Sequence, residues 1–409
     1  MHEILIRLIV GTGLLLGALT LLIAVNKAAR EVREALDRRR RAILEPAVFE
    51  YANATGHRSI LDYLPKSLGR RDRRLAGAIL LDAARVVRGE SRDRITAACE
   101  ALGAVRASIL GLKSRRWWTR AEAAERLGLM RSRTAVEPLV ALMSDPVGEV
   151  RIRSARALGI IRGSTSIRPL VLALTDPSRW SAIRVAEILI DVGSEAVGEL
   201  LAAYDSLPHH ARVSALDVLG RIRSLEASGL IRGALQDPHP DIRARAANAL
   251  GQIGDPGFAD ELVRALRDTE WPVRAMAAKA IGRVGAPAAI PPLCEALKDR
   301  QWWVRANAAE ALRLIGPAGR EALIRMLDAD DTFARHQAVA QLEEGRIIDE
   351  YLADLTSPDA ARRDAAIGFV EKIIRLERVD HLTQVAIDHA QEGVRLALLK
   401  ILQRPQGAS

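Results

Sequence analysis

Aromatic residues are scarce in this 409-residue chain: Phe, Trp and Tyr together make up 3% of it. A protein with so few large rings builds its core from small and aliphatic side chains, and Ala, Leu and Ile are abundant here. The length exceeds that of a typical single compact domain. The composition therefore favours an all-α protein of many short helices, arranged as a repeat array or as several domains.

Cysteine is almost absent too. Cys99 and Cys294 are the only two, far apart in sequence and without a Cys-x-x-Cys spacing. This pattern excludes a disulfide framework, and both thiols lie in apolar helical patterns typical of core residues. The sequence also lacks a Gly-rich phosphate loop, a nucleophile elbow and a His, Cys or carboxylate cluster with metal-ligand spacing. We therefore expect no catalytic residues, no metal and no cofactor.

The net charge of +9 invites a nucleic-acid interpretation, so the position of the excess matters. Residues 26–118 hold 21 Lys and Arg against 11 Asp and Glu, whereas residues 119–409 hold 38 against 39. Most of the chain is thus close to neutral, which disfavours nucleic-acid binding, because that binding depends on clustered positive charge.

The N-terminal segment has a long uncharged run from Leu8 to Val25, about the length that crosses a bilayer as a helix. We therefore predict a transmembrane anchor over residues 1–25. Basic residues follow it, which places the remainder in the cytoplasm by the positive-inside rule and predicts a single-pass protein of the inner membrane. A cleaved secretory signal is the alternative, although its positive charge ought to precede the apolar run.

The anchor is followed by a basic segment, predicted as a juxtamembrane helical region over residues 26–90 before a solenoid over residues 91–409 with degenerate caps. The densest cluster of basic residues in this segment is predicted to contact anionic headgroups at the membrane surface. These residues are Arg38, Arg39, Arg40 and Arg41.

The strongest pattern is a repeat with a period near 31 residues. Its copies include VRIRSARALG from Val150, IRARAANALG from Ile242 and VRANAAEALRLIG from Val304. Each copy carries an arginine at the same place, which we call the register arginine; Ala182 occupies one such place. The register arginines are Arg120, Arg151, Arg212, Arg243, Arg274, Arg305, Arg335, Arg362 and Arg395.

Each repeat is predicted to be a helical hairpin. Its first helix is rich in Ala and is expected to end at a glycine eight residues past the register arginine, where a left-handed residue fits. These glycines are Gly128, Gly159, Gly220, Gly251 and Gly282. A proline in the first turn opens the second helix, and Asp-Pro closes the hairpin.

An aspartate recurs six residues before the register arginine. The carboxylates and guanidiniums are predicted to hydrogen-bond within and between repeats as a structural ladder. The pairs are Asp145 with Arg151, Asp237 with Arg243, Asp268 with Arg274, and Asp299 with Arg305.

These aspartates and arginines resemble those of HEAT repeats, and the Ala-rich first helices with Trp or Val before the arginine are most similar to the phycobilisome-lyase type of repeat. The resemblance covers about residues 90–400. It implies a right-handed α-solenoid with second helices on the concave face and with proteins as the usual ligands. The chain would be a membrane-anchored member of bacterial type. Its implied alternative is a bilin-lyase-like or other HEAT-type enzyme. The His-Glu pairs of the di-iron hydroxylases are missing, since the one such pair is His2-Glu3.

All six tryptophans fall two or three residues before a register position, with Phe333 in the same place. In a solenoid this places them along one edge, either as covers of the hairpin junctions or as anchors for a protein partner. They are Trp117, Trp118, Trp180, Trp271, Trp302 and Trp303. The sequence thus predicts a membrane-anchored, non-enzymatic scaffold that presents a HEAT-repeat surface to a protein partner, such as a membrane enzyme or envelope complex.

Overall fold

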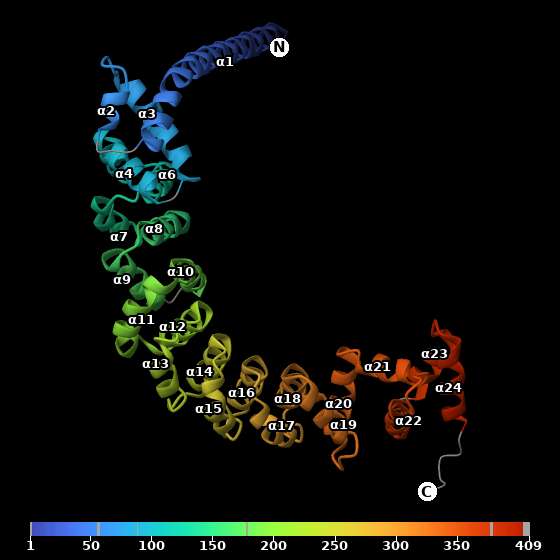
Figure 1. Ribbon diagram of the computed structural model, residues 1–409. Coiled ribbons are helices and arrows are strands. Elements are labelled where there is room, and N and C mark those ends of the chain that lie inside the picture. The colour runs from blue at the N-terminus through green and yellow to red at the C-terminus, as the bar shows by residue number, and fades with distance from the viewer. Residues whose placement is uncertain (1, 55–57, 88, 177–178, 377–378, 404–409) are drawn as a thin grey trace. The chain divides into compact units, whose positions relative to one another are not determined.

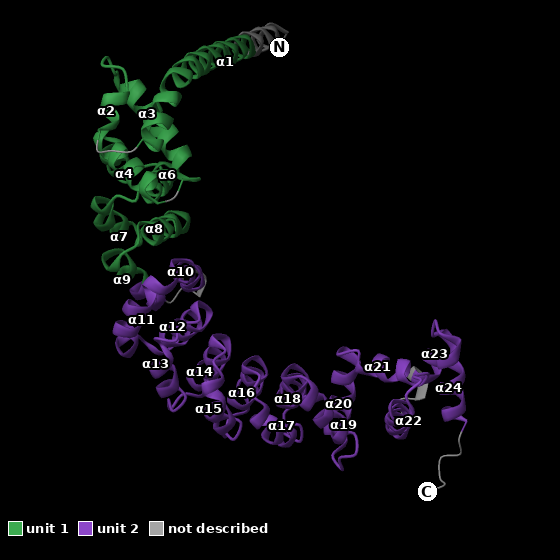
Figure 2. Ribbon diagram, viewed as in Figure 1, with its two compact units in different colours: residues 1–170 green, residues 171–409 purple. Residues whose placement is uncertain are grey.

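The computed structural model describes residues 2–54, 58–87, 89–176, 179–376 and 379–403, without the side chains of residues 2–10, 12–14, 179–181 and 379–381. All regular structure in these ranges is helical (Figure 1). The chain forms two compact units, Met1–Leu170 and Val171–Ser409 (Figure 2). The prediction of an all-α solenoid is confirmed for the described residues.

The first unit begins with a long helix and continues as hairpins. Its helices are α1 (His2–Asn53), α2 (Ile60–Tyr63), α3 (Arg70–Ala84), α4 (Glu90–Ala101), α5 (Ala104–Gly111), α6 (Trp117–Met130), η1 (Arg133–Ala135), α7 (Val136–Leu142), α8 (Gly148–Ile161) and α9 (Ser164–Leu172), the last ending just past the boundary.

The second unit consists of hairpins throughout. Its helices are η2 (Ala173–Thr175), α10 (Arg179–Val192), η3 (Gly193–Ala196), α11 (Val197–Ala203), η4 (Tyr204–Ser206), α12 (His209–Ile222), α13 (Ser228–Ala234), α14 (Pro240–Ile253), η5 (Pro256–Phe258), α15 (Ala259–Ala265), α16 (Trp271–Val284), η6 (Pro287–Ala289), α17 (Ile290–Ala296), α18 (Trp302–Ile315), α19 (Pro317–Met326), α20 (Thr332–Glu344), α21 (Ile347–Asp354), α22 (Ala360–Arg375), α23 (Val379–Asp388) and α24 (Glu392–Leu402).

The predicted transmembrane anchor is wrong: among the residues described, no helix combines the length and the apolar character needed to cross a bilayer. Helix α1 is one continuous helix of 52 residues that carries the basic segment as well as the apolar run, so the apolar residues make up only part of it. Part of the predicted span, residues 1–10 and 12–14, has side chains that lie outside the description. The single-pass inner-membrane placement depended on this helix and is wrong with it.

The first helices of successive repeats pack tightly because glycine meets alanine between them. A Cβ placed on Gly251 of α14 would lie 2.6 Å from the Cα of Ala280 in α16, and one on Gly282 would lie 2.8 Å from the Cα of Ala311 in α18. Both distances are below van der Waals contact, so only glycine permits this approach. The aliphatic residue just before each of these glycines, Leu250 or Ile281, is completely buried in the core.

These contacts correct the predicted role of the register glycines. Gly128, Gly159, Gly220, Gly251 and Gly282 lie inside their helices and do not end them. The left-handed residue that ends the helix comes three residues later, as Arg131, Arg223, Gly254 and Gly285 show. Gly128, Gly220, Gly251 and Gly282 are required by the neighbouring helix and not by a helix end.

The second unit also differs from the implied arrangement of its two helix layers. Figure 1 shows α12, α14, α16 and α18 on the inner side of the arc within this unit, with α13, α15, α17 and α19 outside. The implied placement of second helices on the concave face is therefore wrong here. The physical reason is the close Gly–Ala approach, which draws the first helices together on the inner side.

Candidate interaction surface: the arginine ladder and the aromatic edge

Most register arginines reach back to the loop that precedes their own helix. In Arg243, Nη1 donates to the backbone carbonyl of Asp237, six residues earlier, at 2.9 Å. The same bond, 2.6–3.0 Å long, is made by Arg120, Arg151, Arg274, Arg305, Arg335, Arg363 and Arg395. The spacing of six therefore reflects a bond from arginine to backbone, and it moves the predicted register position Arg362 to Arg363.

The aspartate side chain pairs instead with the register arginine of the preceding repeat. Nε and Nη2 of Arg243 donate to the two carboxylate oxygens of Asp268, each at 2.8 Å. The same bidentate geometry joins Arg274 to Asp299 in the second unit and Arg120 to Asp145 in the first. We call one such arginine–aspartate contact a ladder pair; it links neighbouring repeats, which strengthens the stack.

The paired carboxylates are held in their charged form. Asp268 also accepts a hydrogen bond from the backbone N–H of Glu270 at 2.9 Å. Burial acts to raise the pKa of Asp268, but the hydrogen bonds from Arg243 and from that N–H outweigh it, so the pKa lies below its usual value. The pKa of Asp299 is also lowered, because its hydrogen bonds likewise outweigh the effect of burial. The ladder pairs are therefore ionised at neutral pH.

The ladder is uneven along the chain. Arg212 makes a single bond of 3.1 Å to Asp237, and its Nε is buried without a partner. Arg305 makes the backbone bond to Asp299 at 2.7 Å, yet no carboxylate among the described residues pairs with it. Sequence reasoning missed this feature. The signal was the 30-residue step from Arg305 to Arg335, one residue shorter than the three steps before it.

Aromatic side chains lie at the N-termini of first helices, beside the ladder. Trp271 and Trp302 are the first residues of α16 and α18, Trp303 is the second of α18, and Phe333 is the second of α20. We call these four side chains of the second unit the aromatic edge. Their exposed fractions are 38%, 50%, 57% and 60% in that order. The rings of Trp302 and Trp303 stack edge to face with centroids 4.8 Å apart.

The remaining tryptophans were predicted in the same place. Trp117 and Trp118 begin α6 in the first unit, exposed and edge to face with centroids 6.1 Å apart. Arg116 lies over the Trp118 ring at 5.7 Å. The side chain of Trp180 lies outside the described residues. In both units, then, rings stand at helix starts with much of their area in solvent.

The basic segment lies against a neighbouring helix. Arg40 pairs with Asp72, Arg41 donates to Asp82 at 2.7 Å, and Arg71 donates to Asp37 at 2.7 Å. These contacts join α1 to α3 and engage Arg40 and Arg41 with protein carboxylates. The predicted membrane-surface contact through Arg38, Arg39, Arg40 and Arg41 is not supported.

Reactive or metal-binding clusters are not found among the residues described: they contain no group of three or more His, Cys, Asp or Glu suited to a metal ion. The rings of His209 and His239 are tilted against each other with centroids 4.5 Å apart, and each lies within hydrogen-bond distance of an aspartate. Burial raises the pKa of the Cys99 thiol to about 12 and also raises that of Cys294. Both thiols are therefore protonated at neutral pH and weak as nucleophiles.

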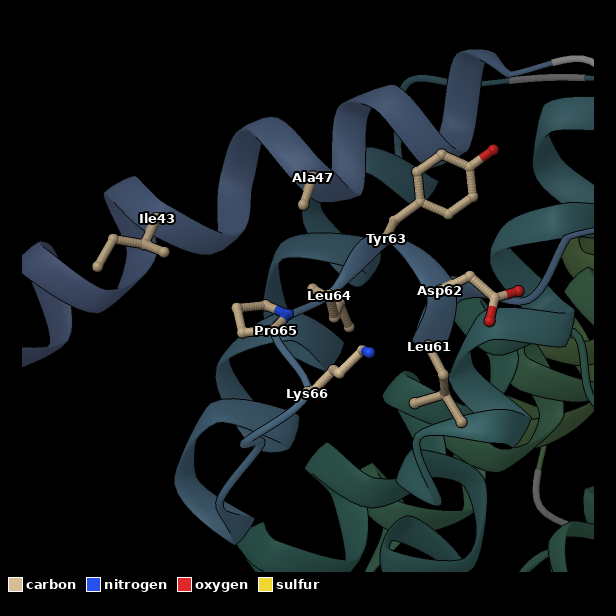
Figure 3. Close-up of a pocket in the computed structure, with 8 residues that line it drawn as sticks. All are labelled: Ile43, Ala47, Leu61, Asp62, Tyr63, Leu64, Pro65 and Lys66. Carbon is tan, nitrogen blue, oxygen red and sulfur yellow. The ribbon is translucent and has the colours of Figure 1, made fainter.

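A cavity of about 660 Å³ lies in the first unit between α1 and residues 61–66 (Figure 3). Ile43 and Ala47 line it from α1, and Leu64, Pro65 and Lys66 from the loop. Its one carboxylate, Asp62, accepts a hydrogen bond from the backbone N–H of Ser59 as part of a helix cap. The cavity thus offers an apolar wall and a lysine, without the acid–base pair that general acid–base catalysis uses.

Comparison with known proteins identifies the repeats. The family model described as HEAT repeats matches residues 105–191, 197–272 and 259–343, more than half of the chain. No curated protein matches the sequence significantly.

Solved structures share the fold at low similarity. An engineered protein is 18% identical, with 88% of this chain and 98% of that one covered and a TM-score of 0.32. The complex of CpcE and CpcF of phycocyanin lyase from Nostoc sp. PCC7120 is 21% identical, with 59% and 94% covered and a TM-score of 0.29. Kap121p bound to Pho4p is 14% identical, with 88% and 49% covered and a TM-score of 0.43, so this chain spans about half of Kap121p.

The helical hairpins, the repeating arginine and the family match agree with one another. HEAT-repeat solenoids are an architecture typical of protein-interaction scaffolds. The chain belongs to the HEAT-repeat family.

Proposed function

We propose that this protein is a non-enzymatic scaffold that binds a protein partner through the aromatic edge of its second unit. The observation that carries the proposal is the row of exposed rings on consecutive repeats, at Trp271, Trp302, Trp303 and Phe333. Exposed rings of this size are costly in water, and tryptophan is enriched among the residues that dominate binding energies.

The platform beneath these rings supports the proposal. Each ring stands in the first turn of a helix whose own start is fixed by a register arginine bonded to the preceding loop. Side chains held on rigid elements lose little conformational entropy when they bind. A partner segment that crosses several repeats would meet one ring after another and gain affinity from each.

Photocrosslinking in cells tests this proposal. A photoreactive amino acid in place of Phe333 is expected to give a discrete protein adduct, and the double variant W302A/W303A is expected to lose it while helicity by circular dichroism stays unchanged. The matched control is Leu225, an exposed apolar residue between α12 and α13, at the opposite ends of the hairpins. Equal adducts at Phe333 and Leu225, or no dependence on the tryptophans, would contradict the proposal.

A further inference from the structure

The arginine ladder stops beneath the aromatic edge. Arg243 and Arg274 each hold a carboxylate of the next repeat through Nε and Nη2. Arg305 is only 7% exposed, and its buried Nε has no hydrogen-bond partner. The Phe333 ring lies over its guanidinium, 4.5 Å from Cζ to the ring centroid. The third consecutive arginine thus keeps its backbone bond and lacks its carboxylate.

A shortened loop explains the missing carboxylate. Nη1 of Arg335 donates to the carbonyl of Ala329, so Ala329 stands at the position that Asp268 and Asp299 hold in the preceding repeats. The nearby Asp331 is engaged differently, since its side chain accepts the N–H of Ala334 and caps α20. Neither residue supplies Arg305 with a carboxylate.

The next position repeats the pattern. Arg335 makes the backbone bond at 2.8 Å, and its Nε is likewise buried without a partner. Ser357 occupies the aspartate position of the following loop, where its carbonyl accepts from Arg363 at 2.7 Å. Two successive register arginines therefore have no carboxylate partner among the described residues, and the first of them lies against the exposed ring of Phe333.

A buried guanidinium edge without an acceptor carries a desolvation cost that a carboxylate would offset. We propose that an acidic segment of the partner protein supplies that carboxylate to Arg305, while its apolar side chains pack on the aromatic edge. This inference rests on the proposed function and adds the chemistry of the partner: aspartate or glutamate interleaved with large apolar residues.

The geometry accommodates both contacts. A carboxylate pairs with guanidinium in its plane, whereas Phe333 covers its face, so the ring and the carboxylate use different sides of Arg305. Nε is buried in the free protein, so the side chains around it must shift when the carboxylate binds. The Phe333 side chain, which lies over the guanidinium, is 60% exposed and has room to turn.

Fluorescence anisotropy with defined peptides tests the inference on the full chain. The probe is a fluorescein-labelled dodecapeptide that alternates Glu with Phe or Leu, and the comparison peptide has Gln in place of every Glu. The acidic peptide is expected to bind about tenfold more tightly than the neutral one, because only the former pairs with the guanidinium. No binding of the acidic peptide, or equal affinities, would overturn the inference.

The variant A329D supplies the missing carboxylate from within the chain. It is expected to weaken the binding of the acidic peptide about tenfold and to raise the Tm of the protein, because Arg305 gains an internal partner. A329N adds nearly the same volume without charge and is expected to weaken the binding of the peptide much less. Equal losses in A329D and A329N would show that bulk, and not charge, causes the effect, and would overturn the inference.

A matched arginine pair separates this inference from the proposed function. R305Q is expected to lose the preference for the acidic peptide, whereas R274Q, whose arginine already holds Asp299, is expected to retain it. If W302A/W303A abolishes binding of both peptides while R305Q changes neither, the aromatic edge binds proteins and the role of Arg305 is refuted. Loss of peptide discrimination with the tryptophans intact supports the role of Arg305.

Discussion

At the scale of single residues, a glycine is required where two first helices touch. We expect Gly251→Ala to lower the free energy of unfolding by roughly 1–3 kcal/mol, because the new methyl group would overlap Ala280. The control is Gly233→Ala in α13, where a Cβ meets open space and helix propensity favours alanine by about 1 kcal/mol. Urea unfolding of both variants checks that their changes in unfolding free energy have opposite signs. A Gly251→Ala protein as stable as the unchanged protein would refute the close approach.

A second residue-level prediction concerns the helix ends. Arg223 ends α12 with φ 58°, whereas the equivalent Gly254 ends α14 with φ 79°. Because a side chain is strained in this left-handed region, Arg223→Gly should stabilise the protein by about 1 kcal/mol. Gly254→Ala should destabilise it by a similar amount. Thermal unfolding measures both, and a lower Tm for Arg223→Gly would contradict the assignment.

At the scale of elements, the ladder pairs hold neighbouring first helices together. Asp299→Asn weakens the bidentate contact with Arg274 and should cost roughly 1–3 kcal/mol. Loss of stability in urea measures this cost. Asp330→Asn, an exposed aspartate outside the ladder pairs, is the control and should change little.

The ladder also makes stability depend on pH. The pKa values of Asp145, Asp237, Asp268 and Asp299 are lowered in the folded state. Their contribution is therefore fully present above the unfolded-state value of about 4 and is lost as the pH falls through the folded values. We expect the Tm to drop on acidification below about pH 4, and to drop less in Asp299→Asn. An unchanged acid profile in that variant would rule out this contribution.

The same elements show where sequence reasoning succeeded and failed. The register arginines were visible as a period, because the backbone bond recurs six residues away in most copies. The function of Gly251 was misjudged, since a glycine near a helix end suggests a cap until the neighbouring helix is seen. The anchor was misjudged because the uncharged, apolar run was interpreted apart from the basic segment, which continues the same helix.

At the scale of the whole molecule, stability should add up repeat by repeat, since each hairpin contacts mainly its neighbours. Deletion of residues 240–270 removes one complete repeat, keeps Asp237 six positions before Arg274 and brings Gly220 opposite Ala280. We expect this variant to fold with unchanged helicity per residue. Deletion of residues 240–254 removes a first helix alone and should unfold the neighbouring hairpins, as circular dichroism would show; equal behaviour of the two deletions would argue against modular stacking.

The sequence by itself determined the helical hairpins, their period and the positions of the tryptophans, because these depend on local composition and on contacts a few residues apart. Only the tertiary structure decided which carboxylate each arginine holds, since the partners lie 25 residues apart in adjacent repeats. It also decided that Arg305 holds no carboxylate within the part of the chain that the structure describes. A loop one residue shorter moves an aspartate out of place, and the consequence appears only where the next repeat packs against it.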